Sequence, residues 1–211
     1  MAMNSMARWA GAFMMTVVAF TGPSWATELT QEQGALLQKV QGYLNDMKNL
    51  KGEFTQVGPA GTVSTGVFFI SKPGKMRFEY AKPNPYLVVS DGRWVVVKNE
   101  TKDKADQYPV SSTPLSILLA DKVDLANADI TNVEERDGTA WVTIQSKDKI
   151  VPGQLVLIYD LAKSELQQWI VVDGQGRKTS VSIANLDPSV TPDPSLFKVE
   201  LPKPAAGQDN N

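Results

Sequence analysis

Residues 75–80 read Lys75-Met-Arg-Phe-Glu-Tyr80, with charged and apolar side chains in strict alternation. Because successive side chains of a β-strand point to opposite faces, Met76, Phe78 and Tyr80 share one face and the three charged residues share the other. The preceding Pro73-Gly74 predicts a tight turn into this strand. The stretch therefore predicts a strand of a sheet that has one apolar face and one face in water.

Outward from this strand, short β-type runs and turn signals continue along most of the chain. Turn signals lie at Asp91-Gly92, at Asp137-Gly138 and at residues 173–176. Strands joined by such short turns must be antiparallel. A parallel sheet would need helices between its strands, and the sequence does not show that alternation. We expect about eleven strands, with β-type runs near residues 54–57, 63–72, 75–80, 86–90, 93–98, 129–136, 139–147, 154–160, 166–172 and 177–185.

Two helical segments are attached to the predicted sheet. Residues 30–33 have the pattern of a capping box, and apolar residues follow at helical spacing, which predicts an amphipathic helix over residues 30–49. Thr113-Pro114 predicts the start of a short apolar helix, and residues 121–127 are expected to add a turn or two. The mixed charges of residues 99–106 are interpreted as a solvated loop.

Composition excludes several classes of function. The chain has 211 residues, with 21 basic and 23 acidic side chains, which argues against a dedicated nucleic-acid-binding protein. It contains no cysteine and no histidine, so disulfides, thiol nucleophiles, histidine bases and metal sites built on these residues are excluded. We therefore predict no catalytic residues, no metal site and no cofactor.

The N-terminal residues 1–26 have the pattern of a secretory signal peptide. Arg8 precedes the apolar run 9–20, and Ser24-Trp25-Ala26 provides small residues at the expected cleavage site. The apolar run is too short to span a bilayer comfortably. We predict cleavage between Ala26 and Thr27, a single exported domain over residues 27–202 and a disordered polar tail over residues 203–211.

The size of the predicted sheet suggests a function in binding. A sheet of about eleven strands is long for an open sheet and is expected to curl. A curled sheet that only two helices cover is either filled by its own side chains or encloses a hollow that holds an apolar ligand. The residue pattern alone leaves both alternatives open.

A series of short motifs resembles one protein family, the periplasmic lipoprotein carrier family, LolA, of Gram-negative bacteria. The resemblance spans residues 30–202. The motifs are Leu50-Lys-Gly-Glu-Phe-Thr-Gln56, Gly66-Val-Phe-Phe-Ile-Ser-Lys-Pro73, Lys75-Met-Arg-Phe-Glu-Tyr80, Pro85-Tyr-Leu-Val-Val-Ser-Asp-Gly92, Thr113-Pro-Leu-Ser-Ile-Leu-Leu119 and Asp193-Pro-Ser-Leu-Phe-Lys-Val-Glu-Leu-Pro202.

The resemblance implies a fold and a function. The fold is mainly β (α+β), an unclosed antiparallel half-barrel of about eleven strands with an α-helical lid. The function is that of a periplasmic carrier, which receives acylated lipoproteins from an inner-membrane lipoprotein-releasing ABC transporter and passes them to an outer-membrane lipoprotein acceptor. We expect such a carrier to be a monomer, because it presents one opening to successive partners.

The resemblance also implies roles for individual residues. Lys72 stands where family members have a basic residue that hydrogen-bonds the lid-helix backbone, so it is the candidate lid latch. Lysine offers a point charge where arginine offers a planar fork of donors. We expect acyl chains to contact the apolar sheet residues, and the lid to present three apolar residues. The candidate cavity residues are Phe68, Ile70, Met76, Phe78 and Tyr80, and the candidate lid residues are Leu115, Ile117 and Leu118.

Two other functions are compatible with the same sequence. A lipid- or lipoprotein-sensing periplasmic regulator could use the same fold, and binding of one membrane protein without acylated cargo would distinguish it. An exported hydrolase is disfavoured, because the chain has no histidine and we find no convincing pair of carboxylates.

Overall fold

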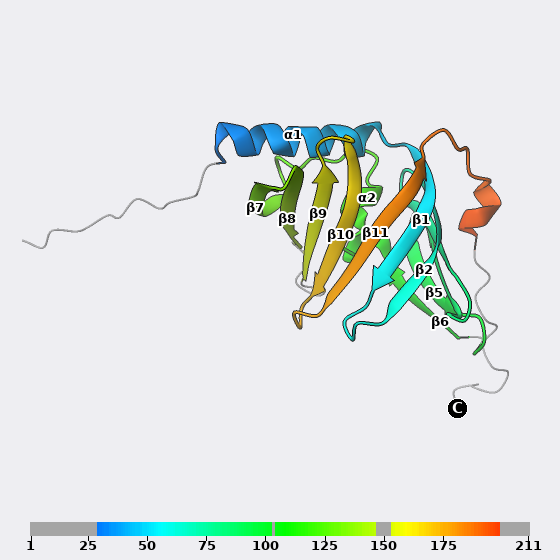
Figure 1. Ribbon diagram of the computed structural model, residues 1–211. Coiled ribbons are helices and arrows are strands. Elements are labelled where there is room, and N and C mark those ends of the chain that lie inside the picture. The colour runs from blue at the N-terminus through cyan, green and yellow to red at the C-terminus, as the bar shows by residue number, and fades with distance from the viewer. Residues whose placement is uncertain (1–28, 103, 147–152, 199–211) are drawn as a thin grey trace, which may run out of the picture.

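Eleven antiparallel strands form one strongly curved sheet in the computed structural model, which describes residues 29–102, 104–146 and 153–198 (Figure 1). The predicted signal peptide with its cleavage site at Ala26 and Thr27, and the predicted tail 203–211, lie outside these residues. The strands are β1 (Asn49–Val57), β2 (Val63–Ser71), β3 (Lys75–Tyr80), β4 (Tyr86–Asp91), β5 (Trp94–Asn99), β6 (Lys104–Pro109), β7 (Asp129–Arg136), β8 (Thr139–Gln145), β9 (Gly153–Asp160), β10 (Glu165–Asp173) and β11 (Lys178–Asp187).

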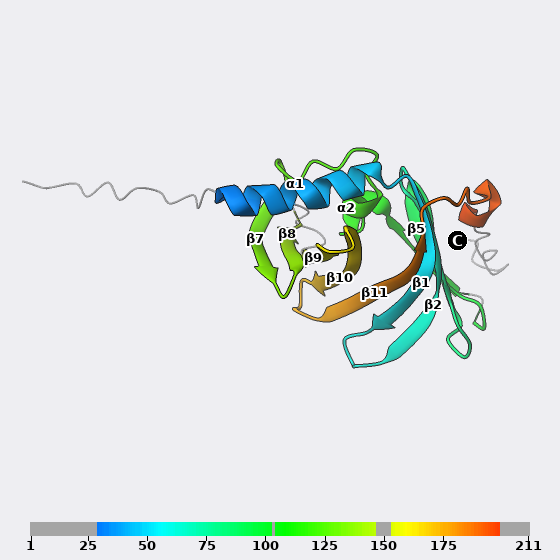
Figure 2. The ribbon, with the colours of Figure 1, turned by 45° about the horizontal axis from the view of Figure 1, so that its top comes forward.

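The sheet is a meander in which the first and last strands meet. Its order is β6-β5-β4-β3-β2-β1-β11-β10-β9-β8-β7, so β1 pairs with β11 in the middle and β6 and β7 form the two edges. The sheet curls round a concave face, and within the described ranges its two edges are not hydrogen-bonded to each other (Figure 2). The expected unclosed half-barrel of eleven antiparallel strands is therefore confirmed.

Two helices cover the concave side of this sheet. Helix α1 (Gln31–Asp46) lies along one rim, while the single turn of α2 (Ser116–Leu119) lies within the curve (Figure 2). The 3₁₀ turn η1 (Val110–Ser112) leads into α2, and a second 3₁₀ turn, η2 (Pro194–Phe197), lies outside the barrel. No described helix combines the length and the apolar character that crossing a membrane requires.

Helix α1 begins as the sequence predicts and ends earlier. Thr30 accepts a hydrogen bond from the backbone N–H of Gln33, and the Gln33 side chain accepts one from the backbone N–H of Thr30, which completes the capping box. Leu37, Val40 and Leu44 form the buried face of this helix. The predicted end at residue 49 is wrong, because Met47 is already extended and the β1–β2 ladder begins with Asn49 opposite Ser71.

Three further boundaries differ from the sequence prediction. Residues 104–106 are not loop, because they begin the edge strand β6, whose many charged and polar side chains are typical of an exposed edge. Thr113 does not cap a helix, since its hydroxyl donates to the carbonyl of Val110 and α2 begins only at Ser116. Residues 121–127 form turns and add no helix.

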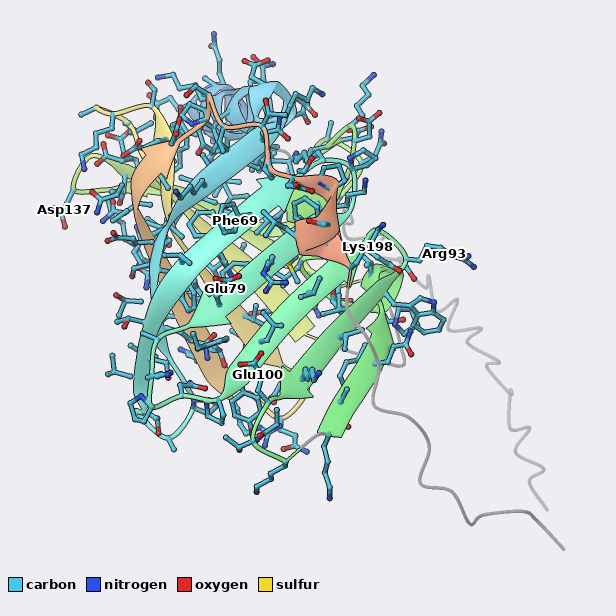
Figure 3. All side chains as sticks on the ribbon, turned by 90° about the vertical axis from the view of Figure 1, so that its right-hand side faces the viewer. Phe69, Glu79, Arg93, Glu100, Asp137 and Lys198 are labelled. Carbon is cyan, nitrogen blue, oxygen red and sulfur yellow. The ribbon has the colours of Figure 1, made fainter. Side chains whose placement is uncertain are left out.

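The outer face of the sheet is only partly in water. Turn η2 packs on the outer face of β3 and β4 (Figure 3). Val89, Val96 and Phe197 are buried there, away from the main core. The guanidinium of Arg77 donates to the carbonyl of Leu196 at 3.0 Å. The alternation of residues 75–80 is confirmed, whereas the prediction that their charged face is wet is wrong for Arg77, whose side chain is only 19% exposed.

Candidate functional site

Aromatic side chains from both walls of the half-barrel meet on its concave side. The rings of Phe68 and Phe78, on neighbouring strands β2 and β3, stack with centroids 5.4 Å apart. Phe78 also contacts Trp169 of β10 edge-on, at 6.2 Å. Strands β3 and β10 lie four positions apart in the sheet, so this contact crosses the hollow. In this state the hollow is filled at the level of Phe78.

The predicted cavity residues all lie in this apolar interior. Phe68, Ile70, Met76 and Phe78 are buried in one continuous core, and Tyr80 is partly buried against it. The Tyr80 ring contacts Phe54 edge-on at 5.0 Å, and its hydroxyl donates to the side-chain oxygen of Gln56. Burial raises the pKa of this hydroxyl, despite the opposing effect of that hydrogen bond. The polar atom that Tyr80 brings to the interior thus has its hydrogen-bond partner.

The side chain of Lys72 connects the sheet to α1. Its Nζ donates to the backbone carbonyl of Leu44 at 2.5 Å, across 28 residues of sequence. Leu44 lies in the last turn of α1, where carbonyls lack a partner inside the helix and where α1 itself carries no basic residue. A cation is favourable at this end of a helix. Lys72 therefore caps α1 from the turn between β2 and β3.

The same turn also holds α2. The backbone N–H of Gly74 donates to the carbonyl of Leu119, the last residue of α2, at 2.8 Å. Gly74 has a positive φ and lies so close to Gly92, in the turn between β4 and β5, that a Cβ would come within 2.6 Å of the Gly92 Cα. A side chain at position 74 would therefore push apart the two turns. Residues 72–74, which we call the β2–β3 turn, thus bind one residue of each helix.

Lys72 is partly buried, and this changes the pKa of its ammonium. Burial, the largest cause, and the positive charge of Lys48 both lower the pKa of this ammonium, Asp121 opposes them, and the net result is a pKa of about 8 in place of 10.5. The bond to Leu44 therefore replaces only part of the hydration that the ammonium loses on burial. Lys72 remains mostly protonated at neutral pH, but the folded state holds its proton less firmly than water would.

We expect Lys72 to make the stability of the protein depend on pH. Because the folded pKa is about 8 and the ordinary value is 10.5, the unfolded chain binds more protons between these two values. The free energy of unfolding of the native protein, minus that of Lys72→Met, should be constant below about pH 8 and increase above it. Chemical denaturation at a series of pH values measures this difference, and a difference that does not change above pH ~8 would contradict the prediction.

A pocket of about 290 Å³ opens beside α2. Apolar side chains line part of it, among them Ile117 of α2, Ile144 of β8 and Leu155 of β9, and polar side chains such as those of Thr113 and Gln145 line the rest. This volume is at the lower limit for pockets that hold a small organic ligand, about 300 Å³. The pocket therefore lies at the small end of the range for ligand-binding pockets.

The structure separates the predicted site residues into two groups. The cavity residues lie in the filled interior, whereas of the three predicted lid residues only Ile117 lines the pocket described above. Leu118 and the unpredicted Leu119 are buried, and Leu115 is partly buried against the same core. Sequence reasoning missed Ile144 as a residue that lines this pocket, although the alternation of β8 marks it as inward-facing.

Comparison with known proteins identifies the family. The family model described as "Outer membrane lipoprotein carrier protein LolA" matches residues 45–200. The outer-membrane lipoprotein carrier protein of Methylococcus capsulatus is 30% identical over an alignment of 180 residues, which covers 81% of this chain and 85% of that protein. That of Cupriavidus pinatubonensis is 24% identical over an alignment of 193 residues, which covers 86% of this chain and 91% of that protein.

A solved structure of a LolA superfamily protein from Nitrosomonas europaea matches with a TM-score of 0.39 and 10% identity, over 78% of this chain and 98% of that one. Because the family model extends from the last turn of α1 to beyond η2, and one relative reaches 30% identity over most of both chains, the chain belongs to the LolA family of outer membrane lipoprotein carrier proteins.

Proposed function

We propose that this protein is a non-enzymatic periplasmic carrier, which binds the acyl chains of lipoproteins released from the inner membrane and delivers them to an outer-membrane acceptor. The names of its relatives support the cargo, since both are outer-membrane lipoprotein carrier proteins. A protein that carries lipoproteins to the outer membrane works in the periplasm, which agrees with the signal peptide predicted over residues 1–26.

The physical task explains why such a protein needs an apolar interior. Each acyl methylene that is exposed to water costs about 0.8 kcal/mol. A lipoprotein with long acyl chains therefore crosses an aqueous space only if those chains remain covered. The carrier must also release them, so its covered and open states must differ by only a few kcal/mol.

One observation carries the proposal: an apolar interior lies under two helices whose ends are held by the single β2–β3 turn. Lys72 binds the end of α1 and Gly74 binds the end of α2. A pocket of about 290 Å³ is too small for several acyl chains, so loading requires α1 and α2 to move away from the sheet. We propose that Lys72 is the latch of this lid.

The same reasoning assigns roles to the interior residues. In the closed state the aromatic contacts between the walls, such as that of Phe78 with Trp169, keep the interior from exposing its apolar surface to water. Opening the lid offers this surface to acyl chains, which replace the contacts between side chains. The proposed acyl-chain contacts are Phe68, Ile70, Met76, Phe78 and Tyr80 from the sheet and Leu115, Ile117 and Leu118 from the lid.

A release assay tests this function. The chain from Thr27 onward is added to spheroplasts that make a labelled triacylated lipoprotein and contain a matching transporter, and the supernatant is assayed for a soluble complex. We expect the native protein to release the cargo as a complex. Ala128→Leu places a larger side chain in the pocket and should lower release by about 10-fold, because it fills the entry.

Ala126→Leu is the matched control for Ala128→Leu, since Ala126 is exposed and lies only two residues away. It should release cargo like the native protein. Absence of release by a folded native protein would overturn the carrier function and favour a regulator that binds one membrane protein. Equal release by both leucine variants would show that the acyl chains do not enter beside α2.

A further inference from the structure

Two amide side chains of α1 bind a segment that is distant in sequence. The Asn45 side chain accepts from the backbone N–H of Val123 at 2.7 Å and donates to the carbonyl of the same residue at 3.0 Å. The Gln41 side chain accepts from the backbone N–H of Leu125 at 2.7 Å. Gln41 and Asn45 are one helical turn apart and therefore share one face of α1.

These hydrogen bonds replace the pairing that a strand would provide. Val123 and Leu125 are 3% and 1% exposed, and neither belongs to a strand of the described chain. A buried backbone N–H without a partner is costly, and here each of the two finds its partner on α1. The segment 119–125 begins at the last residue of α2 and ends at Leu125. Its hydrogen bonds to the Gln41 and Asn45 side chains therefore join α2 to α1 without a strand of the sheet between them.

The position of these contacts relates them to the latch. Asn45 directly follows Leu44, whose carbonyl accepts from Lys72. Leu119, whose carbonyl accepts from the N–H of Gly74, begins the linked segment. Both ends of the linked unit are thus attached to the β2–β3 turn, while Gln41 and Asn45 connect the unit internally.

We propose that Gln41 and Asn45 are positioning residues that make α1 and residues 119–125 one lid, which detaches from the β2–β3 turn as a unit. The inference builds on the proposed carrier function, and it specifies how one latch at α1 controls the access beside α2. Loss of the Lys72 bond then weakens the attachment of Leu119 to Gly74 as well. Without the two amides, α1 and α2 detach independently.

Hydrogen exchange of single backbone amides tests this coupling. The N–H of Gly74 reports the attachment of α2, because it donates to Leu119, and the N–H of Met47 reports the end of α1, because it donates to Tyr43. With the protein purified from the periplasm, Lys72→Met should accelerate exchange at both amides by a similar factor, about 10-fold. In a protein that already carries Gln41→Ala and Asn45→Ala, Lys72→Met should still accelerate exchange of the Met47 N–H. It should change the exchange rate of the Gly74 N–H by less than about 2-fold.

The controls separate coupling from general loss of stability. Gln38→Ala removes an exposed amide side chain of the same helix and should leave the coupled response intact. The N–H of Leu157, in the central part of β9, reports global unfolding and should respond alike to Lys72→Met with and without the two alanines. An unchanged response of Gly74 in the triple variant, or no response of Gly74 to Lys72→Met alone, would overturn the proposal.

The exchange experiment needs no cargo, so its outcome is independent of the carrier function. If the native protein fails to bind acyl chains while the backbone N–H groups of Gly74 and Met47 respond together, the carrier function fails and the single lid stands. If acyl chains bind while Gly74 and Met47 respond separately, the single lid fails and the carrier function stands.

Discussion

Replacing Lys72 with methionine is expected to increase the affinity for a fluorescent fatty acid by about 10-fold. The substitution keeps most of the unbranched side chain, one atom shorter, but leaves the carbonyl of Leu44 without its donor in the closed state, which costs about 1–3 kcal/mol. The open lid is then more populated, and an acyl chain spends less of its binding free energy on opening it. Titration followed by fluorescence measures the change.

Two control variants should leave the affinity for the fatty acid unchanged. Lys72→Arg retains a cation and several donors near Leu44, so its affinity should stay close to the native value. Lys75→Met removes a lysine on the outer side of the same hairpin and should change nothing. If Lys72→Met binds the fatty acid like the native protein, the contact with Leu44 does not hold the lid.

Phe68→Ala is expected to lower the free energy of unfolding by about 3–5 kcal/mol. Phe68 is fully buried, stacks on Phe78, and lies over Gly52, where a Cβ would come within 2.8 Å of the ring. Its loss therefore removes apolar burial and leaves a cavity that the rigid sheet fills only in part. Urea denaturation of the native protein and the variant measures the difference.

Phe69 provides the matched control, because it is the next residue of the same strand and points to the outer face (Figure 3). There it is only partly buried, beneath the ammonium of Lys51 at 5.7 Å from the ring centroid. Phe69→Ala should cost about 1 kcal/mol. Equal losses for the two variants would show that the two faces of β2 do not differ as described.

The sequence predicts the strands of this protein well where side chains alternate and turns are marked. Strands β3 and β7 have the predicted bounds, because alternation and flanking Gly or Asp residues are local signals. Strand β6 is missed, since residues 104–106 are as polar as a loop and become a strand only by pairing with β5. Its pairing partner, not its composition, makes it a strand.

The candidate site is less predictable than the fold. Apolar character places Phe68, Met76 and Phe78 in the interior, but whether that interior is filled depends on the distance between β3 and β10. The outer cluster around Phe197 escapes sequence analysis for the same reason, because the chain must fold back onto β4 before its ring is covered. Contacts of this kind join residues far apart in the chain.

The sequence by itself determines the antiparallel meander, the amphipathic α1 with its capping box and the apolar inner face, because each depends on side chains within a few residues of one another. Only the tertiary structure decides that Lys72 binds Leu44, that Asn45 and Gln41 bind Val123 and Leu125, and that the hollow is filled at the level of Phe78. These hydrogen bonds cross 28 to 84 residues of sequence. Their geometry exists only once the sheet has curled, since its curvature brings the β2–β3 turn, α1 and α2 together.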